Sequence, residues 1–574
     1  MKAKQIQPIH DFYHMLTLNA SLFGSKALFR FHCAEETKEV SYEGLLQMVR
    51  RLSAAAGKLG IAGSHTAIIG ETSVPYVAAY LSTIVSGGVS VPLDKETAPD
   101  EILNFIRRAE VSTVFYGDAF HDLFTSRRAE IPAVTHFIRM PADTFTEGVA
   151  NPTPPTADCT VGALLDYGAF LLESGESAFD GSGADPHVMS TLLFTSGTTG
   201  TSKGVMLSQK NICAVINSAH QQLTISPNDI LLSVLPIHHT YEMTCGILAP
   251  MVYGATICLS DGIRYVAKNI KEFRPTLMTV VPLLVNQLHK AIWKAAEKKG
   301  SADKLRKAIA LSNTLLKWHI DLRPLIFKQV RAAFGGRLSK LVSGGAALNP
   351  LMVDNFKAFG ITISQGYGIT ECAPLLSAIP FDVYNPASCG IPSPGVEVRI
   401  DKDSPDELAG EIVVRGENVM LGYYKNPEAT QEVLSADGWF RTGDYGYLDD
   451  AGFLYITGRK KNVIVLEGGK NVFPEEIEEY LEPLPLVEEV VVVGRTAKDG
   501  ESIHIVALIY PNLETAEEAG LTTPEQIKKV LTEQINQLNK KLPTFKKIHA
   551  LELRETPFEK TTTKKIKRLG LQSE

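Results

Sequence analysis

Short apolar runs alternate with helical hydrophobic patterns over the first 458 residues. Val- and Ile-rich runs occur at residues 65–71, 275–282 and 336–345, and stretches with helical spacing lie between such runs. Continuous apolar runs of this length are typical of strands buried on both faces. Their alternation with helices predicts an α/β domain built on parallel sheets.

The pattern changes twice towards the C-terminus. Residues 391–458 read as short antiparallel strands joined by Asp, Gly and Pro turns, which predicts a small β-barrel-like subdomain. From residue 459 a small α+β unit is predicted, with helices at 474–482 and 523–541 and strands at 488–494 and 502–511. Thr523 is the expected N-cap of the last helix. We therefore expect an N-terminal domain over 1–458 and a C-terminal domain over 459–574.

Four other stretches carry structural information. Residues 290–330 are dense in Lys, Ala and Leu and predict helix throughout, whereas the polar, Gly-rich residues 172–188 predict a surface loop. Residues 72–93 and 243–260 contain no charged residue, but Pro and Gly interrupt both. Neither stretch fits a membrane-spanning helix of about 20 apolar residues, and 72–93 predicts a buried helix, a Gly-Gly turn and a short strand.

Composition narrows the class of protein. The 574 residues are 44% hydrophobic and 21% charged, which is typical of a globular chain. The formal charge of −7 argues against a nucleic-acid partner. Seven scattered cysteines without a C-x-x-C pair argue against a disulfide framework or structural zinc, and the N-terminus does not fit a signal peptide. We expect a cytoplasmic protein, with contact to the inner face of a membrane left open.

The strongest chemical signal is the segment 192–208, in which an apolar strand runs into a Ser/Thr/Gly-rich loop and a lysine. Glycine backbone N–H groups, hydroxyls and an ammonium group are suited to holding phosphates. The spacing differs from a Walker loop, and the alternative is a flexible linker. The candidate phosphate ligands are Thr195, Ser196, Gly197, Thr198, Thr199, Gly200 and Lys203.

This loop resembles the phosphate loop of the adenylate-forming (AMP-binding) superfamily, which includes acyl-CoA synthetases, luciferases and peptide-synthetase adenylation domains. Further segments resemble that superfamily's motifs in the same order: SGGAAL at 343–348, QGYGITE at 365–371, WFRTGD at 439–444, the hinge segment at 458–478 and EKTTTKKIKR at 559–568. The resemblance implies that the C-terminal domain is mobile, with a hinge near Lys461.

The resemblance also implies roles for individual residues. Glu371 is the expected Mg²⁺ ligand, with Thr195 as a second ligand and Thr370 beside it, since Mg²⁺ takes few carboxylates plus phosphate oxygens. Asp444 is expected in a turn, accepting hydrogen bonds from the ribose, and Arg459 is a further expected cofactor-binding residue. The adenine side is expected to comprise Gly344, Gly345, Ala346, Gly366, Tyr367 and Gly368.

Two further sites concern the acyl group and the C-terminal domain. His238 and His239 are candidates for the carboxylate end of the acyl site, with His239 preferred, and Tyr241, Met243 and Ile247 would suit a fatty chain. Lys565 is the expected catalytic lysine, although Lys564 stands where the superfamily usually has glycine and competes for the role. Gly468, Gly469 and Lys470 are expected to line a pantetheine tunnel.

The helical stretch from about 290 and the segment 315–348 resemble long-chain fatty acyl-CoA synthetases. The resemblance implies a ligase that uses ATP, Mg²⁺ and CoA to convert a fatty acid to acyl-AMP and then to acyl-CoA. Alternatives are transfer to an acyl carrier protein, release of acyl-AMP, and a non-catalytic lipid- or nucleotide-binding protein. Chain length and oligomeric state are not determined by the sequence.

Overall fold

A computed structural model describes residues 7–33, 36–141, 152–176, 179, 181, 184–195, 202–466, 471–496, 503–560, 566–568, 570 and 571. The chain divides into two compact units. Unit 1 comprises Met1–Glu397 and Arg415–Gly438, and unit 2 comprises Val398–Val414 and Trp439–Glu574. The division assigns part of the segment 391–458 to unit 2, and the predicted domain boundary at 458/459 stays a prediction.

Unit 1 contains an eight-stranded sheet, and its strands β8 and β9 come directly before and after the phosphate loop in the sequence. Its strand order is β19-β9-β8-β4-β3-β5-β6-β7, and the strands from β8 to β7 are parallel, whereas β9 is antiparallel to both its neighbours. The strands are β3 (His65–Ile69), β4 (Val89–Pro92), β5 (Thr113–Gly117), β6 (His136–Met140), β7 (Asp158–Thr160), β8 (Met189–Thr195), β9 (Lys203–Ser208) and β19 (Gly422–Tyr423).

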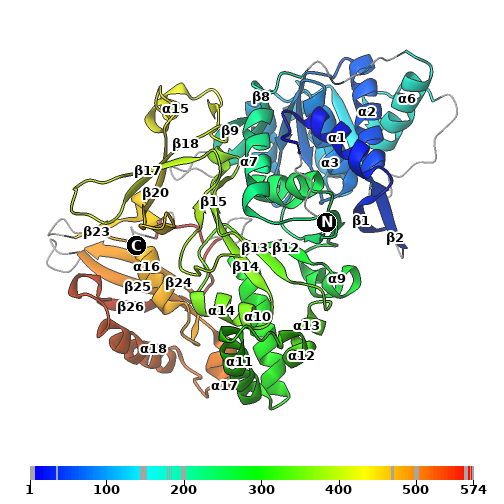
Figure 1. Ribbon diagram of the computed structural model, residues 1–574. Helices are drawn as coiled ribbons and strands as arrows, with labels where there is room; N and C mark the ends of the chain where they lie inside the picture. Colours follow the sequence, from blue (N-terminus) through cyan, green and yellow to red (C-terminus); the bar gives the residue numbers. More distant parts are fainter. Residues whose placement is uncertain are drawn as a thin grey trace. The chain divides into compact units, whose positions relative to one another are not determined.

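Helices pack around this sheet. They are α1 (Phe12–Phe23), α2 (Tyr42–Leu59), α3 (Val74–Val85), α4 (Pro99–Arg108), α5 (His121–Ser126), α6 (Val161–Glu173) and α7 (Gln209–Gln222) (Figure 1). Residues 72–93 form the buried helix α3 and the strand β4, as the sequence predicts. None of the described helices is long and apolar enough to cross a membrane.

The second sheet of unit 1 has nine strands in the order β16-β15-β14-β13-β12-β10-β11-β1-β2. Its central strands are parallel, and antiparallel strands close both edges. The strands are β1 (Ala27–Cys33), β2 (Glu36–Ser41), β10 (Ile230–Ser233), β11 (Thr256–Leu259), β12 (Leu277–Val280), β13 (Lys340–Ser343), β14 (Thr362–Gly368), β15 (Leu375–Ala378) and β16 (Ile391–Pro392).

Residues 241–259 are irregular, as the interrupted apolar pattern predicts. A π-helix over Tyr241–Leu248 runs into the short helix α8 (Ala249–Val252) and then β11. A π-helix inserts extra residues into a helical turn and is often found at functional sites.

The helical region of residues 290–330 differs from the prediction of continuous helix. It contains α10 (Pro282–Lys298), α11 (Ala302–Lys317), α12 (Arg323–Ile326) and α13 (Lys328–Ala333). Gly300 and His319 adopt left-handed conformations with φ of 62° and 59°, which end the preceding helices. The inner faces of α10, α13, α9 (Val266–Phe273) and α14 (Pro350–Ala358) share one apolar core with the second sheet.

Unit 2 contains two principal sheets. A four-stranded sheet of β17 (Glu397–Asp401), β18 (Gly410–Arg415), β20 (Phe440–Leu448) and β21 (Leu454–Arg459) corresponds to the predicted small β subdomain, with β17 and β21 at its edges. The other sheet has β24 (Val487–Thr496), β25 (Ile503–Pro511) and β26 (Ala550–Leu553).

The α+β part of unit 2 matches its predicted elements. The helices are α16 (Pro474–Leu481), α17 (Leu513–Glu518) and α18 (Pro524–Asn539), and α16 and α18 share an apolar core with β24 and β25. Thr523 caps α18 as predicted, in a reciprocal capping box with Gln526.

Candidate active site

The described ends of the phosphate loop lie side by side. Thr195 ends β8 and Lys203 begins β9, and the two residues face each other in an antiparallel pair. The Thr195 hydroxyl donates to the Lys203 carbonyl oxygen over 3.4 Å. The intervening Ser196, Gly197, Thr198, Thr199 and Gly200 lie outside the described residues, so their predicted roles stay predictions.

Lys203, Tyr423 and Glu371 form a continuous polar arrangement. The Lys203 ammonium lies 4.7 Å from the centre of the Tyr423 ring, and the Tyr423 hydroxyl donates to Glu371 Oε1 over 3.0 Å. Burial, followed by the nearby Glu371 charge, raises the pKa of Tyr423, which keeps its hydroxyl protonated and able to donate. The short strand β19 brings Tyr423 here by pairing with β9. Sequence reasoning missed Tyr423, because a tyrosine in a Gly-Tyr-Tyr run gives no distinct signal.

Glu371 lies on a short 3₁₀ helix, Thr370–Cys372, that follows β14. Its backbone carbonyl accepts a hydrogen bond from Met420 N–H over 2.8 Å. The turn before it requires Gly368, where a Cβ atom would lie 2.1 Å from the Pro374 carbonyl oxygen. The backbone of Glu371 is therefore fixed from two sides.

The chemistry of this site fits Mg²⁺ held by few protein ligands. The described residues contain no cluster of three or more His, Cys, Asp or Glu side chains suited to a metal. Mg²⁺ commonly binds one or two carboxylates together with substrate phosphates and water. A half-buried carboxylate near the ends of a phosphate loop has the donor chemistry for that arrangement.

The predicted adenine segments lie at the ends of neighbouring parallel strands. Ser343, at the end of β13, pairs with Gln365 in β14, so 344–346 follow β13 and 366–368 are the last residues of β14 beside them. Gly345 has a φ of 92°, which glycine adopts without strain. A Cβ atom on Gly344 would lie 3.1 Å from the Tyr241 ring, so glycine allows the close approach. Tyr367 is buried, with 7% of its surface exposed.

The carboxyl edge of parallel strands is where open α/β sheets usually bind ligands. The position of 344–346 and 366–368 at this edge is consistent with a ligand-binding role. It does not test the predicted role of Ala346, Gly366 or Tyr367 towards adenine.

The two candidate histidines lie just before the π-helix. Their ring centres are 4.1 Å apart, and His238 Nε2 is 3.6 Å from a carboxylate oxygen of Asp94. Burial lowers the pKa of both histidines, which favours neutral imidazoles at neutral pH. A neutral His239 is suited to hydrogen bonding without adding a charge.

A buried carboxyl group supports the π-helix. Glu242 accepts hydrogen bonds from the Ser233 hydroxyl and, over 2.8 Å, from the Thr279 hydroxyl. Burial raises the pKa of Glu242 to about 7. A Cβ atom on Gly246 would lie 2.6 Å from this carboxyl group. Sequence reasoning missed Glu242, since a single Glu within an apolar stretch does not reveal its partners.

Tyr241 is fixed on the same π-helix. Its hydroxyl group donates to the carbonyl oxygens of Val280 and Val342 over 3.3 and 2.7 Å. Met243 and Ile247 are buried in unit 1. The role of these apolar neighbours towards a fatty chain stays a prediction.

Asp444 lies within β20 in unit 2, so its prediction as a turn residue is wrong. It is 4% exposed and accepts from Arg459 Nε over 3.0 Å. The Thr-Gly-Asp sequence suggested a turn, but pairing with β21 continues through Asp444 and Arg459. The prediction that both contact the nucleotide is not tested by this ion pair.

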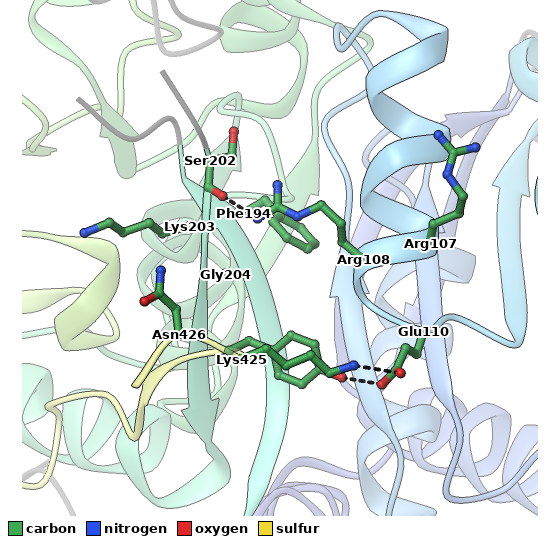
Figure 2. A pocket seen from close by; sticks show the side chains of 10 residues that line it. Arg107, Arg108, Glu110, Phe194, Ser202, Lys203, Gly204, Lys425 and Asn426 are labelled. Atoms are coloured by element: carbon green, nitrogen blue, oxygen red, sulfur yellow. Dashed lines mark hydrogen bonds and ion pairs between the residues drawn. The ribbon is translucent and has the colours of Figure 1, made fainter. Parts of the chain in front are cut away.

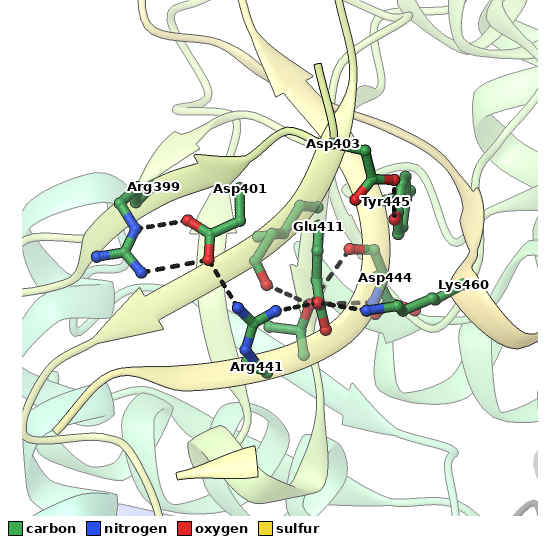
Figure 3. Close-up of polar contacts among 10 residues, drawn as sticks. Arg399, Asp401, Asp403, Glu411, Arg441, Asp444, Tyr445 and Lys460 are labelled. Carbon is green, nitrogen blue, oxygen red and sulfur yellow. Dashed lines mark hydrogen bonds and ion pairs between the residues drawn. The ribbon is translucent and has the colours of Figure 1, made fainter. Parts of the chain in front are cut away.

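Acidic and basic side chains surround Asp444 in unit 2 (Figure 3). Glu411 is 4% exposed and pairs with Arg441 and, over 2.9 Å, with Lys460. Arg441 also contacts Asp401 over 3.0 Å. Because the buried carboxylate has two cationic partners, this part of the sheet is electrostatically satisfied.

The ends of the C-terminal lysine segment are anchored on unit 2. Lys560 pairs with Glu489, and Lys560 forms a β-bridge with Ile566. Arg568 pairs with Glu478, whose other carboxylate oxygen accepts from Val492 N–H over 2.6 Å. The predicted catalytic Lys565 and its competitor Lys564 lie between these anchors, outside the described residues.

The remaining predicted residues of unit 2 are only partly described. Lys461 lies on a short 3₁₀ helix, Lys460–Asn462, and burial followed by the charge of Arg459 lowers its pKa. The predicted tunnel residues Gly468, Gly469 and Lys470 lie outside the described residues.

A pocket of about 390 Å³ in unit 1 is lined by residues from the end of α4 and from β8 and β9, including Lys203 (Figure 2). Arg108 donates to the Ser202 carbonyl oxygen over 2.6 Å, with its guanidinium 5.1 Å from the Phe194 ring centre. Glu110 pairs with Lys425 over 2.7 Å and accepts from Tyr424 over 2.8 Å. These contacts connect the end of α4 to the described end of the loop.

Comparison with known proteins defines the class of this chain. The AMP-binding enzyme family matches residues 19–424, and the AMP-binding enzyme C-terminal domain matches residues 461–572. The protein belongs to the AMP-binding enzyme family, which confirms the resemblance found in the sequence motifs.

Two of the relatives are named as long-chain fatty acid ligases. A long-chain-fatty-acid–CoA ligase, FadD15 of Mycobacterium bovis, is 29% identical over 76% of this chain and 72% of its own length. A chloroplastic long-chain-fatty-acid–[acyl-carrier-protein] ligase of Arabidopsis thaliana, AEE15, is 27% identical over 86% of this chain and 75% of its own.

Solved structures confirm the fold. The anthranilate CoA ligase AuaEII in complex with anthranoyl-AMP has a TM-score of 0.76 at 20% identity, over 100% of this chain and 98% of its own. ATP-bound MatB from Rhodopseudomonas palustris has a TM-score of 0.74 at 24% identity, over 97% of this chain and 98% of its own.

Proposed function

We propose that the protein is a long-chain fatty acid–CoA ligase that forms AMP. In the first step a carboxylate oxygen attacks the α-phosphorus of ATP, acyl-AMP forms and pyrophosphate leaves. In the second step the sulfur of CoA attacks the acyl carbonyl carbon, the thioester forms, and AMP leaves while the thiol proton passes to solvent. The arrangement of Lys203, Tyr423 and Glu371 at the ends of the phosphate loop carries this proposal, in a chain whose relatives include long-chain ligases.

The phosphate end of the site uses unit 1. Ser196, Gly197, Thr198, Thr199 and Gly200 supply backbone and hydroxyl donors to the phosphates, and Lys203 supplies positive charge. Glu371, with Thr195, holds Mg²⁺, and the Tyr423 hydroxyl fixes one carboxylate oxygen so that the other can reach the ion. Bound Mg²⁺ neutralises phosphate charge. Thr370 lies beside Glu371 and orients the same phosphates.

The remaining candidate residues contact the nucleoside and the fatty acid in this proposal. The Gly344–Ala346 and Gly366–Gly368 segments border adenine, with Tyr367 alongside the base. Asp444 accepts from the ribose hydroxyls, with Arg459 holding its carboxylate in place. His239 borders the fatty acid carboxylate as a neutral imidazole, in agreement with its lowered pKa.

The second step uses the C-terminal domain, which we place at 459–574 with its hinge near Lys461. Lys565 stabilises charge on the α-phosphate during adenylation. After a rotation of the domain, Gly468 and Lys470 border the path of the pantetheine thiol.

The proposal has one specific alternative, which is that acyl carrier protein rather than CoA accepts the acyl group. The relative AEE15 is named as an acyl-carrier-protein ligase, and pantetheine is common to CoA and carrier protein. CoA is favoured because several of the relatives are named as CoA ligases or as an acyl-CoA synthetase.

One experiment tests activity and acceptor together. Pyrophosphate release is measured with ATP, Mg²⁺ and palmitate, alone and with CoA or acyl carrier protein, and the thioester is detected by mass spectrometry. We expect release that CoA stimulates and a palmitoyl-CoA product. Thioester formed with carrier protein but not CoA would establish the competitor, and no release with any acid would support a binding protein.

The same assay tests the substrate class. Each buried CH₂ contributes about 0.8 kcal/mol of transfer free energy, so kcat/KM is expected to rise steeply with chain length. A higher kcat/KM for acetate than for every long acid tested would refute the long-chain assignment.

A further inference from the structure

Five large apolar side chains are exposed to solvent within residues 302–333, which we define as the α11–α13 surface. Trp318 and Leu325 are each 75% exposed and Leu311 is 53% exposed, and Ile320 and Leu322 are exposed as well. Neither α12 nor α13 contains a buried residue, and Ser312 is the buried residue of α11. The helices contact one another in sequence at one end of unit 1 (Figure 1).

The two faces of α11 have different chemistry. Leu305, Ala308 and Ile309 pack against the apolar core of unit 1. Lys304, Lys307 and Leu311 recur at intervals of three and four residues, and all three are exposed. This spacing places them on one outer face, with Trp318 in the same register one residue beyond the helix. The outer face therefore combines ammonium groups with apolar side chains.

The segment that contains this surface has a charge opposite to that of the rest of the chain. Residues 290–337 carry twelve Lys and Arg against three Asp and Glu, a formal charge of +9, whereas the whole chain has −7 and the remainder therefore −16. Lys304, Lys307, Lys317 and Lys328 are all exposed. A positive region on an acidic protein orients it towards an anionic partner.

We propose that the α11–α13 surface docks on an anionic lipid bilayer. Tryptophan and leucine enter the boundary between headgroups and acyl chains, and lysines near the surface are attracted to anionic headgroups. A symmetric contact between two copies is disfavoured because residues 302–333 carry seven Lys and Arg against two Asp and Glu, so it would bring two surfaces of formal charge +5 together. The proposal does not rest on the proposed activity, since binding is measured without substrates.

The test uses the full-length protein and sedimented vesicles. We expect binding to phosphatidylcholine vesicles that contain about one quarter phosphatidylglycerol, weaker binding to pure phosphatidylcholine, and loss of binding as salt increases. The tryptophan emission is expected to shift to shorter wavelength on binding. Trp318→Phe is expected to remove most of that shift, since Trp318 is 75% exposed on the α11–α13 surface, whereas Trp293 is half-buried against Arg306 and Trp439 lies outside the surface.

Matched variants separate this surface from general charge and hydrophobicity. Lys304→Glu/Lys307→Glu is expected to weaken partitioning roughly thirty-fold or more, because each basic residue near the bilayer contributes substantially. Lys528→Glu/Lys529→Glu makes the same change in net charge at exposed positions of α18 and is the control. Trp318→Ser/Leu325→Ser is compared with Leu408→Ser/Leu513→Ser, whose leucines are 66% and 56% exposed.

All these changes are at exposed or flanking positions, and unchanged thermal unfolding verifies that each variant folds. Selective loss of vesicle binding in the two α11–α13 variants supports the proposal. Equal loss in the controls, binding independent of anionic lipid, or no vesicle binding by the unaltered protein overturns it. Self-association or capture of an acidic protein through this surface, without vesicle binding, overturns it as well.

Discussion

At the scale of single residues, the carboxylate of Glu371 has a well-defined environment in unit 1. The Tyr423 hydroxyl occupies one of its oxygens, and the backbone around it is fixed by Met420 and by the close approach at Gly368. Such fixation prepares a single carboxylate to hold an ion in one position.

Glu371→Gln is expected to lower pyrophosphate release on the order of 10²–10³-fold, by analogy with loss of one preorganised electrostatic contact. Glutamine keeps the shape and a hydrogen-bond acceptor but removes the charge. Conversion of supplied acyl-AMP and CoA to thioester is expected to persist, because the pyrophosphate has already left. The measurement is both half-reactions over a Mg²⁺ titration, with Glu417→Gln as an exposed control. Unchanged release at saturating Mg²⁺ would show that Glu371 is not the ligand.

Glu242 gives a prediction about pH and stability. Its pKa is about 7 in the fold because of burial, against 4.5 for the unperturbed group. As pH rises from about 4.5 to 7, the unfolded chain releases this proton first, so folding stability falls by about 3 kcal/mol across that range.

Glu242→Gln is expected to remove this part of the pH dependence. The free energy of unfolding is measured by denaturant for both proteins at about pH 5 and pH 8, and the variant is expected to lose less stability between them. Glu482, whose pKa is also raised to about 7, contributes equally to both proteins and cancels in the comparison. An identical pH dependence would show that Glu242 ionises normally.

At the scale of elements, the parallel strands were the easiest to predict. The runs that form β3, β12 and β13 are mostly buried and contain apolar residues without strict alternation, a pattern that burial on both faces of a sheet favours. The breaks near Gly300 and His319 were not predicted, because Lys, Ala and Leu favour helix on either side of them. The π-helix was not predictable either, since its extra residues hardly alter the apolar spacing.

Contacts between distant segments explain what the sequence left out of the site. The motifs led to Lys203 and Glu371, but Tyr423 joins them only because β19 pairs with β9. Asp444 was misread for the same reason: a Thr-Gly-Asp sequence is typical of turns, yet the partner strand β21 extends the sheet through it.

The ion pair between Arg568 and Glu478 holds the C-terminal segment on unit 2, and its contribution to stability can be measured. Arg568→Ala leaves the buried Glu478 without its cation and is expected to lower the free energy of unfolding by about 1–3 kcal/mol. Glu478→Gln in the same chain is expected to restore part of the loss, because the amide oxygen still accepts from Val492 N–H. Denaturant unfolding of the four proteins in this cycle measures the coupling. Additive losses would show that the pair contributes nothing beyond its separate residues.

At the scale of the whole molecule, the proposed reaction requires two steps with different demands on unit 2. Only adenylation needs positive charge at the α-phosphate, and only thioester formation needs an open path for the thiol. The two half-reactions can therefore be lost independently.

Lys565→Ala is expected to lower adenylation on the order of 10²–10³-fold while supplied acyl-AMP and CoA are still converted.

Gly468→Leu is expected to preserve pyrophosphate release and reduce thioester formation, because its side chain occupies the proposed thiol path. Lys461→Pro is expected to resemble Gly468→Leu, since a fixed φ near −65° restricts rotation at the proposed hinge. Each half-reaction is assayed separately, with Lys567→Ala as the control for charge in the same segment. Equal loss of both in Lys565→Ala, with the fold intact, would make Lys565 structural, and recovery of the predicted pattern in Lys564→Ala would transfer the role to that neighbour.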